Sequence, residues 1–479
     1  MIRLLLAGAG VLLTAGACPA ATSGAAGAEA NLGAVIPLWL GIPFAGILLS
    51  IALFPVLAPR FWHHRYPWVS AAWGLAAVVP FVALHAGRAV NELLHIVLVD
   101  YIPFIILLWG LFTVSGGIAL RGRLVGTPGL NLLFMASGTV LASFMGTTGA
   151  AMLLIRPLLK ANRNRRHKVH TVVFFIFLTA NVGGCLTPLG DPPLFLGFLH
   201  HVPFFWTLKL MPVFLFTAGV LLAVYALIET RLYRQDRRGM LRKEAEAPDP
   251  HRLSVDGKRN FLFLGGILGA VLMSGMWAGP GFHLLGIPLS LQNLARDGLI
   301  VLMGGLSLGF TRRETRDYNE FGWGPIREVA ILFAGIFVTI APVIAILKAG
   351  EAGPLAALVR SVREPWQYFW AVGGLSSFLD NAPTYYTFFN MALGRFFPGS
   401  PEFEAVRGLI GHHPLWLEAI SAGAVFMGAN TYIGNAPNFM VRSIAEEAGV
   451  AMPSFFGYLF RWSLPILIPT FLVVGWLFF

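Results

Sequence analysis

The sequence "GGLSSFLDNAPTYYTFFNMAL", residues 373–393, contains one charged residue, Asp380, in a stretch that is otherwise free of charge. An ionised carboxylate at the centre of a bilayer costs roughly 2.5 to 3.5 kcal/mol on insertion scales unless other groups compensate it. An acidic residue in such a segment is therefore a candidate for binding an ion or a substrate, and the surrounding sequence has to explain what compensates its charge.

The composition is that of a polytopic membrane protein. Of the 479 residues, 56% are hydrophobic and only 12% are charged, and the mean hydropathy is +0.71. The basic residues behind the net charge of +11 lie in short loops between apolar segments, which argues against a nucleic-acid-binding domain and indicates determinants of topology instead. The two cysteines, Cys18 and Cys185, are too few for a disulfide framework or a metal site of their own.

Apolar segments that are long enough to cross a bilayer as helices recur along the chain. About ten of them predict full transmembrane helices: 33–57, 68–86, 95–120, 171–199, 208–228, 260–281, 294–310, 326–347, 415–441 and 457–479. Two further apolar segments, 131–159 and 366–394, carry Gly and polar residues at mid-length. Each of these two could form one spanning helix or a re-entrant hairpin that enters and leaves on the same face.

Basic residues discriminate between these alternatives, because short cytoplasmic loops carry an excess of Lys and Arg. Segment 131–159 has Arg121 and Arg123 before it and "KANRNRRHK", 160–168, after it, so both flanks are expected in the cytoplasm. With two hairpins, the predicted cytoplasmic loops hold 24 Lys and Arg residues and the opposite side holds eight. With two single spans, segment 229–259 and its nine basic residues would lie outside. The charge distribution therefore favours two hairpins.

The order of spans then repeats with opposite orientation, which predicts an all-α inverted-repeat secondary transporter. The charged segment between the repeats is expected to be a solvated cytoplasmic linker. The predicted boundaries are 33–228 for the first repeat with its hairpin 131–159 and interrupted helix 171–199, 229–259 for the linker, and 260–479 for the second repeat with its hairpin 366–394 and interrupted helix 415–441.

Residues 1–28 are typical of a secretory signal peptide that is removed. Arg3 precedes an apolar run from Leu4 to Leu13, and an A-x-A pattern at 26–28 offers a cleavage site. An uncleaved first helix and a lipobox-like site at "AGAC", which ends at Cys18, are the alternatives.

Helix-breaking residues interrupt four predicted segments at matched positions. The four sequences are "SFMGTTGAAMLL" (143–154), "TANVGGCLTPLGDPPLFLG" (179–197), "GGLSSFLDNAPTYYTF" (373–388) and "MGANTYIGNAPNFM" (427–440). Gly and Pro interrupt the helical hydrogen-bond ladder there and leave backbone groups available to a ligand. Polar side chains that accompany the breaks are the predicted ion- or substrate-binding residues: Thr147, Thr148, Asn181, Thr187, Asp191, Ser377, Asp380, Asn381, Asn430, Thr431 and Asn435.

Carboxylate, amide, hydroxyl and carbonyl oxygens are hard ligands, which suit sodium better than a soft metal. We therefore expect Asp191, Asp380 and Asn381 to be the main sodium ligands. A carboxylate can also take up a proton when the metal cation leaves, so the same group could exchange sodium for protons.

Three other charged residues have competing interpretations. Asp191 could simply cap a half-helix before Pro192. Arg156, in the outgoing arm of the first hairpin, could extend to the membrane surface, balance a carboxylate or bind an anionic substrate. Asp100 lies near a predicted span end, where solvation is the simplest expectation.

These motifs resemble the ion transporter superfamily, in particular NhaD-type sodium/proton antiporters and CitMHS-like citrate transporters. The similarity covers most of residues 95–479 and rests on "GGLSSFLDNAPT", "GTTGAAMLLIRPLLKAN" and "ANVGGCLTPLGDPPLFLG". It implies a scaffold domain that often dimerises, and a transport domain with both hairpins that moves in an elevator-like manner. It also implies that Asp380 and Asn381 form the acidic ion-site pair, with Asn430 and Thr431 at the polar break of the last core helix.

The sequence thus predicts a sodium (or lithium)/proton antiporter in the inner membrane, with a sodium-coupled citrate or carboxylate transporter as the alternative. The dicarboxylate carriers of the superfamily have Ser-Asn-Thr at both hairpin tips, whereas this chain has Thr147-Thr148 and Asp380-Asn381, which favours the antiporter. An ion channel is a third possibility. An enzyme is not expected, because no nucleophile–base pair or metal motif is evident. The expected partners are lipid, sodium, protons and a second copy of the chain, with no cofactor or nucleic acid.

Overall fold

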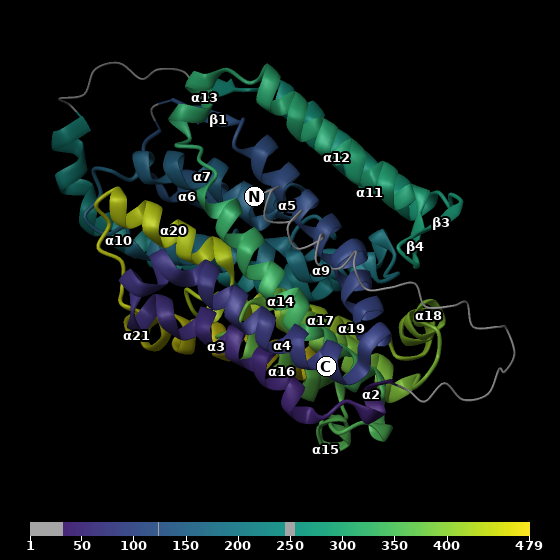
Figure 1. Cartoon of the computed structure of the whole chain (residues 1–479). Helices are drawn as coiled ribbons and strands as arrows, with labels where there is room; N and C mark the ends of the chain where they lie inside the picture. The colour runs from purple at the N-terminus through teal and green to yellow at the C-terminus, as the bar shows by residue number, and fades with distance from the viewer. Residues whose placement is uncertain (1–31, 123, 245–253) are drawn as a thin grey trace, which may run out of the picture.

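The computed structural model describes residues 32–122, 124–244 and 254–479, and nearly all of its elements are helices (Figure 1). The predicted signal peptide 1–28 lies outside these residues. In the described ranges, seven helical segments are long and apolar enough to cross a membrane: Leu38–Pro55, Pro59–Ser115, Pro128–Met145, Phe204–Asp236, Arg259–Met276, Gly324–Lys348 and Phe455–Phe478. The chain is therefore a multi-pass, all-α membrane protein.

In the described part of the chain, the first helices are α2 (Leu32–Val35), η1 (Leu38–Gly41), α3 (Ile42–Leu57), α4 (Pro59–His95), η2 (Ile96–Tyr101) and α5 (Ile102–Ser115). The spans predicted at 68–86 and 95–120 fall within a helical run from Pro59 to Ser115, in which two helices meet at a kink at Ala86 without a loop between them. A local break at Ala86, where φ is 43°, bends this run. Such a break in the hydrogen-bond ladder is one of the recognised causes of a helix kink.

Both predicted hairpin segments contain two helices with a short break between them. Their helices are α6 (Pro128–Met145) and α7 (Thr147–Ala161) in the first, and α16 (Pro365–Ser376) and α17 (Asn381–Phe396) in the second. Gly146 makes the first break with a φ of 79°, a conformation that favours glycine because other residues have a Cβ atom.

The two predicted interrupted helices are also broken. They consist of α8 (Val169–Leu178), η3 (Val182–Cys185) and α9 (Pro192–Leu199), and of α19 (Pro414–Met427), η6 (Gly428–Asn430) and α20 (Ala436–Glu447). Glycines allow close backbone contact at both breaks. A Cβ atom at Gly190 would lie 2.1 Å from the carbonyl oxygen of Gly184, and one at Gly434 would lie 2.6 Å from that of Gly428. Any other residue at Gly190 or Gly434 would force the two backbone segments apart.

The remaining elements complete the bundle. They are β1 (Ala119–Arg121), η4 (Phe204–Leu210), α10 (Met211–Glu244), β2 (Ser254–Asp256), α11 (Arg259–Met276), β3 (Gly281–Leu284), β4 (Ile287–Ser290), α12 (Leu291–Phe310), α13 (Arg313–Tyr318), α14 (Gly324–Lys348), η5 (Gly350–Ala352), α15 (Ala356–Ser361), α18 (Glu402–His412), α21 (Phe455–Tyr458), η7 (Leu459–Leu467) and α22 (Ile468–Phe478). Strands β1 and β2 pair antiparallel, as do β3 and β4. Helices α11 and α12 lie side by side along one edge of the molecule (Figure 1).

The core is formed by the broken helices and the second arms of the hairpins. In α8, every residue from His170 to Leu178 is buried. In α17, nearly all residues from Asn381 to Gly394 are buried, and α16 and α17 both pack on α19. Helices that are covered on all sides can contain a polar break only where protein groups or a ligand satisfy it.

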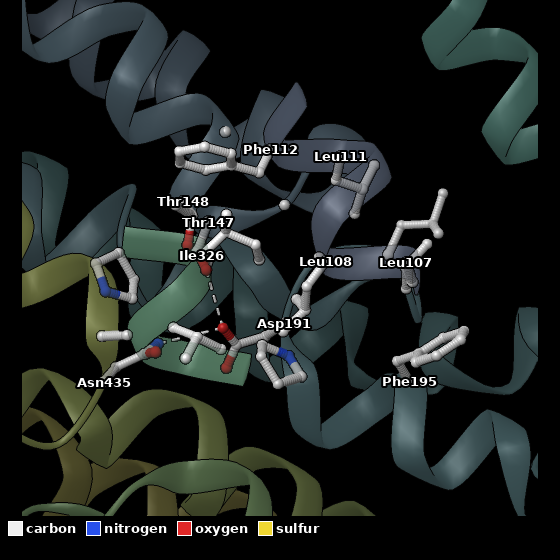
Figure 2. Close-up of a pocket in the computed structure, with 18 of the residues that line it drawn as sticks. Leu107, Leu108, Leu111, Phe112, Thr147, Thr148, Asp191, Phe195, Ile326 and Asn435 are labelled. Atoms are coloured by element: carbon white, nitrogen blue, oxygen red, sulfur yellow. Dashed lines mark hydrogen bonds between the residues drawn. The ribbon is translucent and has the colours of Figure 1, made fainter. Parts of the chain in front are cut away.

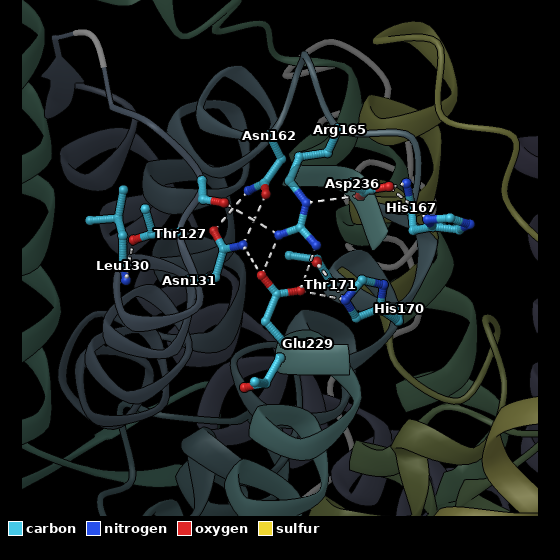
Figure 3. Close-up of polar contacts among 12 residues, drawn as sticks. Thr127, Leu130, Asn131, Asn162, Arg165, His167, His170, Thr171, Glu229 and Asp236 are labelled. Carbon is cyan, nitrogen blue, oxygen red and sulfur yellow. Dashed lines mark hydrogen bonds and ion pairs between the residues drawn. The ribbon is translucent and has the colours of Figure 1, made fainter. Parts of the chain in front are cut away.

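The predicted solvated linker 229–259 is wrong in its first part, because α10 continues as a helix to Glu244 and buries two acidic residues (Figure 3). The carboxylate of Glu229 accepts hydrogen bonds from the Arg165 guanidinium and lies 2.6 Å from Nε2 of His170. Asp236 accepts from Nε of Arg165 at 3.2 Å and lies 2.8 Å from Nδ1 of His167. These fixed cationic partners explain why charges in a basic segment are buried rather than solvated.

The same network ties the first hairpin to α10. Asn131 of α6 donates from Nδ2 to Glu229 at 2.8 Å and to Asn162, just after α7, at 2.9 Å. Burial alone would lower the pKa of Arg165, but the carboxylates of Glu229 and Asp236 outweigh burial and raise it. Both ends of the hairpin are thus held by charge-assisted hydrogen bonds.

A second ionic cluster, buried at Asp100 and His200 and partly exposed at Lys348 and Glu402, joins η2, α9, α14 and α18. Asp100 is fully buried, with Oδ1 3.2 Å from His200, so the expectation of a solvated Asp100 is wrong. His200 also contacts Glu402 at 2.5 Å, and Nζ of Lys348 lies 2.6 Å from the same carboxylate. Burial would raise the pKa of Glu402, but the positive charges of His200 and Lys348 hold it well below its usual range.

Candidate ion-binding site

A cavity of about 100 Å³ lies where α5, the start of α7, the residue before α9, α14 and the start of α20 meet (Figure 2). Most of its wall is apolar, with Leu, Ile, Val, Phe and Pro side chains. The polar side chains in the wall are Thr147, Thr148, Asp191, Asp380 and Asn435. The wall contains two carboxylates, and no Lys, Arg or His is among the described residues that line it.

Asp191 is the most enclosed of these groups, with 2% of its surface exposed. Its Oδ1 accepts hydrogen bonds from Thr147 Oγ1 at 3.0 Å and from Asn435 Nδ2 at 3.2 Å, and its Oδ2 accepts from Asn381 Nδ2. Figure 2 shows the first two of these bonds from α7 and from the segment before α20. The side chain makes no capping bond to α9, so the interpretation of Asp191 as a simple helix cap is wrong.

Asp380 lies at the break of the second hairpin and lines the same cavity. Its side chain accepts from the backbone N–H of Ala382 at 3.1 Å and so caps α17. The rest of its carboxylate has no cationic partner among the described side chains, and the residue is partly exposed. Asp380 is therefore a more accessible carboxylate than Asp191.

Asn381 and Asn430 each have a buried side-chain oxygen without a hydrogen-bond donor among the described residues. Asn381 uses its nitrogen for Asp191, and its Oδ1 is left free. Asn430 donates from Nδ2 to Ser377 Oγ at 2.9 Å, and its Oδ1 is left free as well. Neither residue lines the cavity, but because a buried acceptor without a donor is costly, these two oxygens are candidate ligands of a cation.

Asn438, which sequence reasoning missed, satisfies backbone groups that the break in the last core helix frees. Its Nδ2 donates to the carbonyl oxygens of Gly428 at 2.8 Å and Thr431 at 2.9 Å, and its Oδ1 accepts from Asn181 at 2.7 Å. Some of the carbonyls that were expected to face a cation are thus occupied. The only signal in the sequence was one more amide residue after Pro437.

Thr187, Thr431 and Ser377 hold the breaks together rather than lining the cavity. The hydroxyl of Thr187 donates to the carbonyl oxygen of Ser143, and that of Thr431 donates to the carbonyl oxygen of Ser377. Ser143 in turn donates to the carbonyl oxygen of Gly183, whereas the hydroxyl of Ser377 lies 2.7 Å from the carbonyl oxygen of Gly373 and 3.2 Å from that of Met427. Each hairpin is therefore bonded to the broken helix that follows it, in the same pattern.

The other predicted residues divide between the cavity and its surroundings. Thr148 lines the cavity, and no described side chain bonds to its hydroxyl. Asn181 does not line the cavity. The Nδ2 atom of Asn181 donates to the carbonyl oxygen of Ile176 at 2.8 Å. Arg156 lies outside the cavity and pairs with Glu320 at 2.7 Å, so neither Asp191 nor Asp380 is its partner.

Neutral donors alone stabilise the buried carboxylate of Asp191, and the cavity wall brings no positive charge to either carboxylate. Such an arrangement leaves net negative charge in an apolar surrounding, which a bound cation or a proton can neutralise. Carboxylate, amide and hydroxyl oxygens within one small cavity form a hard donor set that fits sodium or lithium.

Comparisons with known proteins agree with a transport role. No curated protein matches the chain. A family described as "Putative citrate transport" matches residues 33–479, which is nearly the whole chain and all of the residues that line the cavity. With this match, and with the resemblance that the hairpin motifs indicated, the chain belongs to the CitMHS_2 family of membrane transporters.

Proposed function

We propose that this protein is a secondary active antiporter that exchanges sodium or lithium for protons at Asp191 and Asp380. One observation carries the proposal: two carboxylates line one apolar cavity whose described wall supplies no cationic side chain. An anionic substrate alone would meet two negative charges there. A metal cation or a proton would instead remove the cost of burying them.

The hydrogen bonds of Asp191 suggest how the two cations compete. In the structure, Thr147, Asn381 and Asn435 donate to the carboxylate. A sodium ion would take these oxygen-bearing side chains as ligands after rotation of the amides, so that amide oxygens replace N–H groups around the carboxylate. A proton on the same carboxylate removes its charge and the attraction for sodium. Because sodium and a proton cannot occupy this carboxylate at the same time, binding of one releases the other.

We further propose that the chain is built as an inverted repeat of two re-entrant hairpins and two broken helices within about ten spans, with its basic loops in the cytoplasm. The matched bonds from Thr187 to Ser143 and from Thr431 to Ser377 support this symmetry. The paired Gly190 and Gly434 contacts support it as well. In such transporters, the ion site lies between broken helices near the middle of the bilayer.

The second candidate function is sodium-coupled transport of citrate or another carboxylate, which the family description favours. In that case Asp191 and Asp380 would bind the coupling ion first, and the neutralised cavity would then admit an anion. The two functions therefore share the cation site and differ in whether an anion follows the cation.

A vesicle assay separates the two functions. Everted membrane vesicles with a preformed pH gradient and a pH-sensitive dye receive sodium, lithium or potassium, and separately citrate with sodium. The antiporter is expected to dissipate the gradient on addition of sodium or lithium alone, and Asp191→Asn is expected to prevent this. The matched control Asp317→Asn, at an exposed surface position, should behave as the wild type. Sodium-dependent uptake of radioactive citrate by the same vesicles, with a gradient that sodium and lithium alone leave intact, would favour the carboxylate transporter and refute the antiporter.

A further inference from the structure

A second cavity, of about 310 Å³, lies at the opposite ends of α7 and α20 from Asp191. Its wall is formed by the last turns of α7 and the loop that follows, by the residues around the end of α13, and by the end of α20. In Figure 1, α7, α13 and α20 occupy the same part of the molecule. The charged residues in the wall are Arg156, Lys160, Arg163, Lys168, Glu320 and Glu447.

Positive charge exceeds negative charge in this cavity, because four basic side chains face two acidic ones. Arg156 is neutralised by Glu320 at 2.7 Å, and Nζ of Lys160 lies 3.9 Å from the centre of the Tyr318 ring. Arg163 and Lys168 have no carboxylate within ion-pair distance among the described residues. Glu447 is likewise unpaired among the described residues, so Lys160, Arg163 and Lys168 leave the wall with a net positive charge.

We propose that this cavity is an oxyanion-binding site that takes a phosphate or carboxylate group between Arg163, Lys168 and Lys160. A guanidinium group binds such oxyanions through two parallel hydrogen bonds, and an ammonium group adds a point charge. Basic pockets between helices at the cytoplasmic surface of membrane proteins bind lipid headgroups in this way. The oxyanion comes either from the headgroup of an anionic phospholipid or from a free anion.

The position of the site gives it a role beyond simple charge balance. Thr147, the first residue of α7, and Asn435, just before α20, both bind Asp191, and α7 with its 15 residues spans about 22 Å. The oxyanion site lies at the far ends of these two helices and also contacts Tyr318. A bound oxyanion would fix the end of α7 to the loop that follows it, because Lys160 lies on α7 and Arg163 and Lys168 lie on that loop. The inference does not depend on which cation or substrate the protein transports.

The test uses the full chain in nanodiscs of phosphatidylcholine, with thermal unfolding as the readout. One arm raises the fraction of phosphatidylglycerol, and the other adds inorganic phosphate or citrate at constant ionic strength. The test variant is R163Q/K168Q, and the control is R231Q/R234Q, which removes the same charge from two exposed positions on α10. Both variants change solvent-accessible side chains and should match the wild type in phosphatidylcholine alone.

The wild type is expected to unfold at a higher temperature as the oxyanion concentration rises. R163Q/K168Q should need about thirty times more anion for the same shift, since each removed charge weakens attraction about fivefold. The control should stay within about twofold of the wild type. A response to phosphatidylglycerol alone assigns the site to a lipid, and a response to phosphate or citrate that R163Q/K168Q weakens assigns it to a free anion. No response in either arm, or equal responses of the two variants, would overturn the proposal.

Discussion

Two buried carboxylates in this protein are stabilised in opposite ways. Glu229 binds the guanidinium of Arg165 and the imidazole of His170, whereas Asp191 binds one hydroxyl and two amides. Both side chains are almost completely inaccessible to solvent. A carboxylate that is paired with a fixed cation is already neutralised. A carboxylate that is bonded only to neutral donors can still be stabilised by a mobile cation. This difference separates a structural network from a candidate transport site.

The largest expected effect is that of Asp191→Asn. The amide has nearly the same shape but no negative charge, so cation exchange should be abolished while the protein still folds. The measurement is sodium-dependent proton flux in proteoliposomes, with size-exclusion chromatography and thermal unfolding as checks on folding. Flux at the wild-type rate would place the transported cation elsewhere.

Glu229→Gln should have the converse effect. It leaves Arg165 buried without its main carboxylate partner and should lower the free energy of unfolding by about 3 to 5 kcal/mol. Flux per folded molecule should stay close to that of the wild type. Arg121→Gln is the control, because its ion pair with Asp256 is solvent-accessible and contributes less than about 1 kcal/mol. Equal thermal stability of these two variants would contradict the assignment of the Glu229 network as structural.

The sequence predicted the breaks and much of the cavity, but not the partners of the buried charges. Gly and Pro within apolar segments located the breaks, and the polar residues beside them included Thr147, Asp191, Asp380 and Asn435, which all line the cavity. The two ionic clusters were missed because a charge at the end of a span looks the same in the sequence whether it is solvated or paired. Asp100 and Glu229 became distinguishable only when the fold brought His200 and Arg165 to them from distant segments.

Asp380→Asn is expected to weaken cation binding by about a hundredfold rather than to abolish it. Asp380 is partly exposed, and its one hydrogen bond caps α17, a role that asparagine can also fill. The effect should therefore appear mainly as a higher sodium concentration for half-maximal flux, at nearly unchanged thermal stability. A complete loss of flux at saturating sodium would make Asp380, and not Asp191, the principal carboxylate.

Smaller effects are expected at the two adjacent threonines. Thr147→Val removes one hydrogen bond to a charged group and should weaken sodium binding about tenfold. Thr148→Val removes a hydroxyl that no described side chain binds, so its effect should be below about threefold. Titration of flux with sodium compares the two variants directly, and the reverse order would mean that Thr148 is the ligand.

The central claim is that a metal cation and a proton compete for the carboxylate of Asp191. The most direct test is equilibrium binding of radioactive sodium to the purified protein across a series of pH values. If one proton is displaced, the apparent dissociation constant should rise about tenfold for each unit by which the pH falls in the acidic part of the series, and Asp191→Asn should show no specific binding. Sodium binding that is independent of pH, or that persists in Asp191→Asn, would contradict the proposed exchange.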